Sequence, residues 1–136
     1  MDSSHNEHIE PRNPGTFVSK KSLDYNNIVA SCKGFKGDET CGKHKKNRYD
    51  EDKFISPLNP ECEDKFTYYP DGIMDGDDYT TELLHLNSYE LKEARKAVYR
   101  QLLYFDKEMI EQIFLDESSE EREPFVNVAK WYVKML

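Results

Sequence analysis

The sequence lacks any long hydrophobic run, because no stretch of 18 apolar residues occurs within its 136 positions. A transmembrane helix is therefore not expected. The opening segment, residues 1–15, has neither a hydrophobic region nor an Arg-rich amphipathic face, which are the marks of signal and transit peptides. These absences favour an intracellular protein.

Catalytic motifs are missing as well. The sequence has no G-x-S-x-G, H-E-x-x-H or G-x-x-x-x-G-K pattern, and its six glycines are few for shaping a buried pocket. His5 and His8 fall in a polar N-terminal segment, and His85 falls between two leucines, where packing or surface exposure is the simpler interpretation. We therefore predict that the protein is not an enzyme and binds no cofactor, unless its cysteines hold zinc.

Positive charge is scarce overall, since 19 Lys and Arg residues face 27 Asp and Glu residues and the net charge is −8. The charge is divided unevenly, because residues 1–48 carry +3 and residues 49–136 carry −11. An acidic body repels phosphate backbones, so we predict against nucleic acid as a partner. The basic stretch 33–48, flanked by aromatic Tyr49, could stack on nucleotides, but we favour its contact with an acidic protein surface.

Cysteine occurs only three times and never in a closely spaced pair. Cys32, Cys41, His44 and Cys62 follow the spacing C-x8-C-x2-H-x17-C. Three thiolates and one imidazole suit tetrahedral zinc, so these four residues are the candidate metal ligands. Two alternatives stay open: free cysteines beside a solvated histidine, and a Cys32–Cys41 disulfide, which needs an oxidising compartment.

The sequence does contain a long amphipathic pattern between Asn87 and Leu115. At 100° per residue, one apolar stripe continues through the whole segment. Its members are Leu91, Ala94, Val98, Leu102, Phe105, Met109 and Ile113. A second stripe, with Ile110 and Phe114, opens beside it in the later half. We predict one long helix over about residues 88–115, and whether it breaks at Asp106 stays open.

A further apolar face predicts a last helix over about residues 121–136. Its members are Phe125, Val128, Ala129, Tyr132, Val133 and Leu136, and Trp131 lies off this face. Before the long helix, Asp77 or Asp78 is expected to cap a short helix that ends near Leu86. The sequence thus predicts a mainly α fold in which residues 71–136 form a helical docking unit.

Residues 1–70 are predicted to form an extended and mostly irregular arm. Residues 1–25 are polar, contain Pro11 and Pro14 and show no helical or strand period, so alone they should be disordered. Pro57 and Pro60 keep the later part of the arm extended. We expect the arm to become ordered mainly on a partner.

The arm also contains a short repeat, because Glu-Asp-Lys-Phe occurs at residues 51–54 and again at residues 63–66. A β-hairpin or coincidence is the simpler explanation. The alternative is a docking motif in which Phe54 and Phe66 are anchors within an acidic rim. The predicted partner-binding residues are Phe54, Phe66, Trp131 and Tyr132.

These observations predict a non-enzymatic structural or assembly subunit, a scaffold that cements neighbouring proteins in a larger complex through protein–protein interaction. Viral shells, with their minor virion components, and cytoskeletal lattices contain subunits built in this way. The second hypothesis is a small zinc-binding module, whose Cys/His loop presents a basic surface to nucleic acid or to a regulatory partner.

Overall fold

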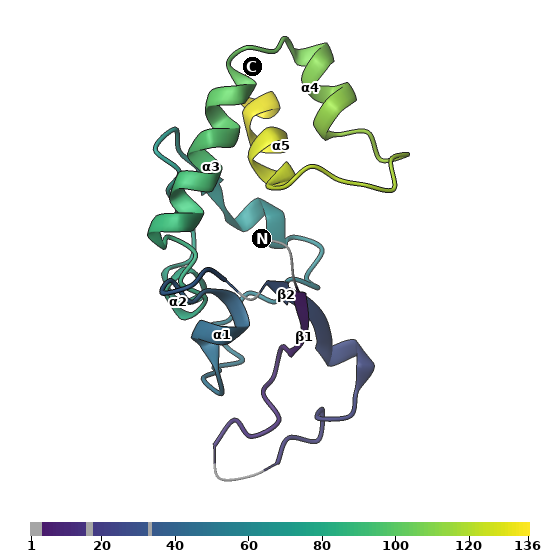
Figure 1. Cartoon of the computed structure of the whole chain (residues 1–136). Helices are drawn as coiled ribbons and strands as arrows, with labels where there is room; N and C mark the ends of the chain where they lie inside the picture. The colour runs from purple at the N-terminus through teal and green to yellow at the C-terminus, as the bar shows by residue number, and fades with distance from the viewer. Residues whose placement is uncertain (1–3, 16–17, 33) are drawn as a thin grey trace.

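The computed structural model describes residues 4–15, 18–32 and 34–136. Its elements in chain order are β1 (Ser4–His8), the 3-10 helix η1 (Tyr25–Asn27), β2 (Ile28–Cys32), α1 (Cys41–Lys45), the 3-10 helix η2 (Cys62–Lys65), β3 (Thr67–Tyr68), β4 (Met74–Asp75), α2 (Asp78–Leu83), α3 (Tyr89–Leu102), α4 (Lys107–Phe114) and α5 (Val126–Met135). Figure 1 shows the β1–β2 hairpin and α1 at one end of the molecule and the last three helices at the other.

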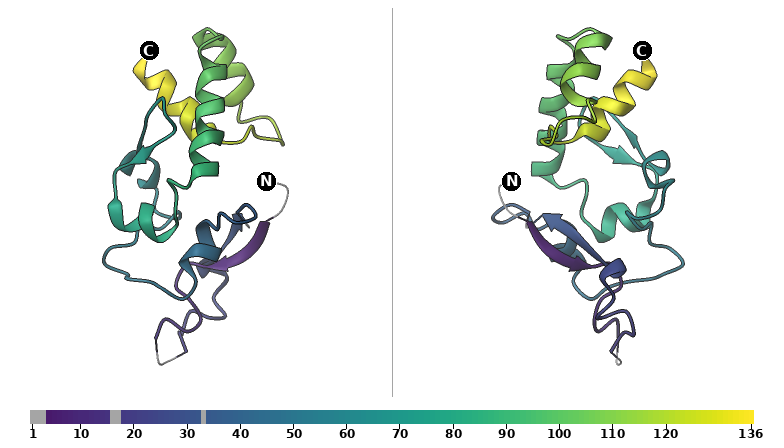
Figure 2. Two further views of the ribbon diagram at one scale, coloured as in Figure 1. Left: turned by 60° about the vertical axis from the view of Figure 1, so that its left-hand side comes forward. Right: turned by 90° about the vertical axis from the view of Figure 1, so that its right-hand side faces the viewer.

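The N-terminal end is a β-hairpin with a short helix, which we call the hairpin–helix unit (the described residues from 4 to 48). β1 and β2 pair antiparallel, from Ser4 opposite Cys32 to His8 opposite Ile28, and α1 lies beside β2 (Figure 2). The prediction of an irregular arm, and with it the mainly α fold class, is therefore wrong. The fold mixes helices with two small antiparallel sheets.

Buried polar residues hold the hairpin–helix unit together. Ser19, Asn27, Thr40 and Lys45 are all at most 6% exposed. Such residues are mostly exposed in proteins and are buried only when they are hydrogen-bonded. A prediction from hydropathy treats polar residues as solvent-exposed, which is why no core was predicted in this region.

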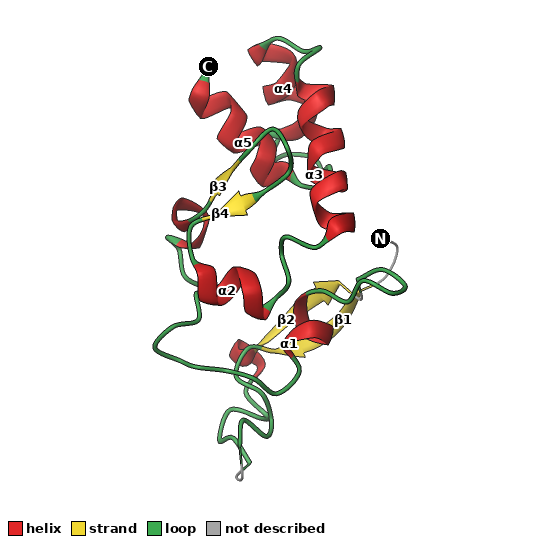
Figure 3. Cartoon of the chain, turned by 90° about the vertical axis from the view of Figure 1, so that its left-hand side faces the viewer, coloured by secondary structure: helices red, strands yellow, loops and turns green. Residues whose placement is uncertain are grey.

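The middle of the molecule joins the two ends. β3 and β4 form a two-residue ladder, and α2 follows directly (Figure 3). Asp77 caps α2 by accepting a hydrogen bond from the backbone N–H of Thr80 at 2.8 Å, which confirms the predicted cap. The C-terminal end of α2 then meets α1, because the backbone N–H of Cys41 donates to the carbonyl of Leu84 at 2.8 Å.

The predicted helix over residues 88–115 is two helices. α3 ends at Leu102, and Asp106 caps α4 by accepting from the backbone N–H of Met109 at 2.9 Å. An aspartate side chain competes for backbone N–H groups and so favours a new helix start over helix continuation. α4 also turns its second stripe inward, because Ile110 is fully buried whereas Met109 is 41% exposed.

The hydrophobic core lies between α3, α4 and α5. Its buried members are Tyr68, Leu102, Ile110, Phe114, Val128 and Ala129. The last helix begins at Val126, five residues later than predicted, because Phe125 takes a left-handed conformation (φ 57°) that interrupts helical geometry. Among the helices of the described ranges, none has the length and apolar character needed to cross a membrane.

Candidate active site

Asn27 joins the two strands where the hairpin opens into its long loop. Its Oδ1 accepts from the backbone N–H of Glu10 at 2.8 Å, and its Nδ2 donates to the carbonyl of Glu10 at 2.9 Å. The backbone carbonyl of Asn27 also accepts from the N–H of Ile9 at 2.8 Å. One buried side chain therefore fixes the chain just beyond β1 and orients the residues at the end of that strand.

His8, the last residue of β1, is half-buried and oriented by the same loop. Its Nε2 lies 2.9 Å from the backbone carbonyl oxygen of Ser22. A carbonyl oxygen can only accept, so Nε2 carries the hydrogen and Nδ1 of the neutral ring is the nitrogen that accepts a proton. This arrangement, with one ring nitrogen fixed by a carbonyl and the other basic, suits a general base.

Glu7 precedes His8 and faces α1. The buried Lys45 ammonium group of α1 lies 3.5 Å from Oε1 of Glu7 and donates to the carbonyl of His8 at 3.1 Å. Burial lowers the pKa of Lys45, and the charge of Glu7 acts in the opposite direction. A Cβ atom at Gly42 would overlap the Glu7 carboxylate, so glycine is what allows this carboxylate to approach the helix.

A hollow of about 210 Å³ lies between the end of β1 and α1. The residues that line it include Glu7 and His8 of β1 and two cationic residues, Arg12 and Lys46. Asn47 also lines this hollow. The lining residues thus include one imidazole, one carboxylate and two cationic side chains, a set of groups that together can bind and hydrolyse a phosphate ester.

A second hollow, of about 420 Å³, continues from the first. It shares Lys46 and Asn47 with it and adds Arg48 and the loop residues 13–15. Arg12, Lys46 and Arg48 are all exposed. Arg12 lines the first hollow, Arg48 lines the second and Lys46 lines both. We call the two adjoining hollows the groove, whose cations an extended polyanion can contact.

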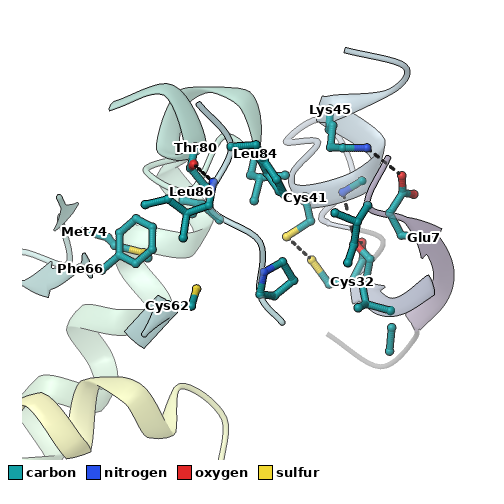
Figure 4. A pocket seen from close by; sticks show the side chains of 18 of the residues that line it. Glu7, Cys32, Cys41, Lys45, Cys62, Phe66, Met74, Thr80, Leu84 and Leu86 are labelled. Carbon is teal, nitrogen blue, oxygen red and sulfur yellow. Dashed lines mark hydrogen bonds and ion pairs between the residues drawn. The ribbon is translucent and has the colours of Figure 1, made fainter. Parts of the chain in front are cut away.

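The structure brings together only part of the predicted zinc set. The Sγ atoms of Cys32 and Cys41 lie 3.2 Å apart. His44 Nδ1 lies 2.8 Å from the carbonyl of Leu83, and its ring stacks on His85 with the centroids 4.7 Å apart. Cys62 belongs to η2 and lies apart from the other two cysteines in the close-up of Figure 4.

Within the described residues, no group of three or more His, Cys, Asp or Glu side chains is arranged to hold a metal ion. A cation that takes most of its ligands from water and substrate does not need such a group. Mg²⁺ is of this kind, since it usually binds through one or two carboxylates plus phosphate oxygens. The Glu7 carboxylate beside the cationic hollow fits this donor chemistry, and a metal ion is therefore compatible with the site.

The four predicted partner-binding aromatics are at least half-buried. Phe54 and Phe66, the two repeat phenylalanines, both line an apolar cavity of about 320 Å³. Figure 4 shows Phe66 in the wall of this cavity. Trp131 packs against the core, and Tyr132 meets the ring of Tyr99 edge-on at 5.5 Å. Their role in partner binding stays a prediction.

Sequence reasoning missed Glu7 and His8 because it assigned the first 25 residues to a disordered tail, and it missed Asn27 because residues 1–70 were predicted to form a mostly irregular arm. β1 (SHNEH) shows no apolar alternation, so no strand signal was available there. The one usable signal was the β-branched pair Ile28 and Val29, which favours a strand and requires a pairing partner.

No protein-family model matches this chain. Among curated proteins, the chain is 28% identical over 119 residues to the Retron Vc95 putative HNH endonuclease of Vibrio cholerae serotype O1 biovar El Tor. This match covers 79% of the present chain and 57% of the relative, so the chain spans little more than half the relative's length.

This similarity overturns several predictions made from the sequence. A structural or assembly subunit, with the virion and scaffold roles attached to it, is contradicted because the relative is named as an endonuclease. The predictions that the chain is not an enzyme and that nucleic acid is no partner are contradicted on the same ground. The net charge of −8 was misleading here, because the acidic excess belongs to residues 49–136 and the groove belongs to the basic N-terminal part.

Proposed function

We propose that the chain is a nuclease that hydrolyses phosphodiester bonds in the hollow between β1 and α1. The observation that carries this proposal is the position of Glu7 and His8, consecutive residues of β1, on the wall of a hollow lined by Arg12 and Lys46. The endonuclease name of the relative supports the same reaction class.

Each of these residues has a role in the proposed reaction. His8 takes a proton from the attacking water through Nδ1, while the carbonyl of Ser22 holds its other ring nitrogen. Arg12 and Lys46 bind the phosphate oxygens and stabilise the negative charge that develops on them. Asn27 keeps the end of β1 in the orientation that this proton transfer requires.

Glu7 is the residue that would hold a divalent cation. Such a cation, when bound, polarises a phosphoryl oxygen and lowers the pKa of a bound water. The Lys45 ammonium group lies 3.5 Å from Oε1 of Glu7 and holds this carboxylate close to α1. We therefore propose dependence on a hard cation such as Mg²⁺, with the substrate's phosphate and water as the remaining ligands.

The letters in the relative's name are the one-letter codes of histidine, asparagine and histidine. The hairpin–helix unit contains His8, Asn27 and His44 in this order along the chain. His44 is directed toward Leu83 and is not among the residues that line the hollow. The proposal therefore assigns roles in the reaction to His8 and Asn27 only, and zinc binding by Cys32, Cys41, His44 and Cys62 stays a separate prediction.

The test is cleavage of circular plasmid DNA, circular single-stranded DNA and RNA by the purified chain, with Mg²⁺ or Mn²⁺ and with EDTA. We expect metal-dependent cleavage of at least one substrate. His8→Ala should reduce the rate by about a hundredfold or more, the usual contribution of a general base. His85→Asn is the matched control, because His85 lies outside the hollow and asparagine tolerates its left-handed backbone.

Full activity of the His8→Ala variant would contradict the assignment of the base, provided that a metal-dependent activity is present in the wild type. Absence of cleavage and of binding for all three nucleic acids, by a chain shown to be folded, would contradict the function itself. Equal losses in His8→Ala and His85→Asn would indicate a general effect on folding, which the unfolding midpoint of each variant reveals.

A further inference from the structure

The hairpin–helix unit contains a close pair of thiols that the proposed reaction does not use. Cys32 is the last residue of β2 and Cys41 is the first residue of α1. Their Sγ atoms lie 3.2 Å apart, in direct contact, and face each other in Figure 4. The pair is remote in sequence from Cys62, and nothing in the nuclease proposal depends on it.

Contacts on both sides fix the two cysteines. The backbone N–H of Cys41 donates to the carbonyl of Leu84 at 2.8 Å, and the next residue, Gly42, donates its N–H to Ser31 Oγ at 3.2 Å. The fully buried Thr40 lies with its Oγ1 3.5 Å from Cys32 Sγ. Since a disulfide has an S–S distance of about 2.05 Å, bond formation requires the sulfurs to approach by roughly 1 Å.

The two thiols differ in their chemistry. The hydrogen bond from Cys41 lowers the pKa of Cys32 to about 5, and hydrogen bonds from Thr40 and the backbone of Gly34 add to this effect. The same contact raises the pKa of Cys41. The contact between the two sulfurs therefore favours the thiolate form of Cys32 and the protonated form of Cys41. A nucleophile beside a resolving thiol is the arrangement found in redox-sensitive cysteine pairs.

We propose that Cys32 and Cys41 form a modification site, which hydrogen peroxide converts into an intramolecular disulfide between β2 and α1.

In the first step, the Cys32 thiolate attacks one oxygen of the peroxide. An S–O bond forms, the O–O bond breaks, and the departing hydroxide takes up a proton and becomes water. In the second step, the Cys41 sulfur attacks the sulfenic acid, the S–S bond forms, and the hydroxyl group leaves with the proton of Cys41 as a second water. Two thiols are oxidised and one peroxide is reduced.

The bond would connect α1 covalently to the hairpin. α1 carries Gly42 and Lys45, both of which meet Glu7. Oxidation thus fixes the helix against β1 and β2 and limits the separation of these elements. The effect on the molecule is greater resistance to local opening of the hairpin–helix unit, since a cross-link restricts the open states.

Cys62 is an internal control within the same chain. It belongs to η2, and burial raises its pKa. Figure 4 draws it apart from the pair, with no interaction to either thiol. A peroxide reaction that depends on the Cys32–Cys41 contact should therefore leave Cys62 as a free thiol.

The experiment treats the reduced full-length chain with a small excess of hydrogen peroxide, stops the reaction with catalase and measures the intact mass. A non-reducing peptide map then identifies the bonds. We expect the loss of two hydrogens, a cross-link between the peptides of Cys32 and Cys41, and alkylation of Cys62 only. Cys62→Ser should behave identically, and Cys41→Ser should stop at a Cys32 sulfenic acid that dimedone traps.

Three results would overturn the proposal. The first is oxidation of Cys62 with Cys32 and Cys41 still free, and the second is a cross-link between two chains in place of an internal one. The third is one equivalent of zinc in the purified chain, with thiols that react only after chelation, because this result would assign Cys32 and Cys41 to the predicted metal site. The wild-type map requires no variant, so misfolding of a mutant does not affect these outcomes.

Discussion

Asn27 holds the backbone of Glu10 from both sides, since its side chain accepts from the N–H at 2.8 Å and donates to the carbonyl at 2.9 Å. The two residues are 17 positions apart in sequence and lie where the long loop between β1 and β2 closes. The Asn27 amide thereby extends the pairing of β1 with β2, because its two hydrogen bonds replace a pair of backbone hydrogen bonds between the strands. His8 lies two residues before Glu10, in the strand whose end this closure holds in place.

Replacing Asn27 by alanine should destabilise the chain strongly. Asn27 is 6% exposed, so the substitution leaves the N–H and carbonyl of Glu10 without their partners. With about 1–3 kcal/mol for each buried group left unpaired, we expect a loss of roughly 2–4 kcal/mol in the free energy of unfolding. Urea denaturation measures it. Asn26→Ala is the matched control and should change the stability by less than about 0.5 kcal/mol, because Asn26 is exposed.

Lys45 should contribute to stability through its two contacts with β1. Its ammonium group donates to the carbonyl of His8 at 3.1 Å and lies 3.5 Å from Glu7. Lys45→Met keeps the length of the side chain but removes the donor, which should cost about 1–3 kcal/mol of unfolding free energy. Lys43→Met, on the exposed side of α1, should have little effect. Equal stability of the two variants would show that the buried ammonium group is dispensable.

The groove should bind nucleic acid in a salt-dependent manner. If Arg12 and Lys46 each neutralise one phosphate, the double variant Arg12→Ala/Lys46→Ala should reduce the slope of log K against log salt concentration by about 2 on duplex DNA. Fluorescence anisotropy at several salt concentrations measures this slope. Arg100→Ala/Lys107→Ala removes the same charge from the α3 and α4 end of the molecule. An equal change in slope for both variants would indicate that net charge, and not the groove, determines binding.

The two isoleucines of α4 test which face of this helix meets the core. Ile110 is fully buried, whereas Ile113 is 43% exposed. Ile110→Ala should therefore cost about 2–5 kcal/mol, the range for truncation of a buried aliphatic side chain. Ile113→Ala should cost clearly less. A continuous helix over residues 88–115 predicts the reverse order, because Ile113 belongs to the stripe that begins at Leu91.

The helical half of the molecule was largely predictable because its signals are local. Asp77 caps α2 as expected, and the apolar faces of α3 and α5 lie where the 3.6-residue period indicates. The break at Asp106 had a local signal too, but the period alone could not decide between a cap and a solvent-facing aspartate. The 3.6-residue spacing of apolar side chains continued across residues 103–106 only by coincidence, although the chain is not helical there.

The hairpin and the candidate site were not predictable from these rules because their interactions are distant in sequence. Glu10 meets Asn27 across 17 residues, and Lys45 meets Glu7 across 38. No period in the sequence encodes such pairs. The residues involved are polar, so a prediction based on apolar content assigns them to a disordered tail. The net charge averaged over the whole chain also conceals the cations of the groove.

Alkylation of the cysteines at different pH values tests the electrostatics of the thiol pair independently of oxidation. The thiolate is the reactive form, so reactivity falls as the pH decreases through the pKa. With a pKa of about 5, Cys32 should react with iodoacetamide across the neutral range and lose half of its reactivity near pH 5. Burial raises the pKa of Cys62 above its ordinary value of 9.0, so Cys62 should react only in alkaline solution.

Cys41→Ser should leave the alkylation of Cys62 unchanged. It should shift the Cys32 midpoint if the thiol of Cys41 is the hydrogen-bond donor that stabilises the thiolate, since a hydroxyl donor differs in strength and reach. Coincident midpoints for Cys32 and Cys62 in the wild type would show that the contact between Cys32 and Cys41 does not activate either thiol.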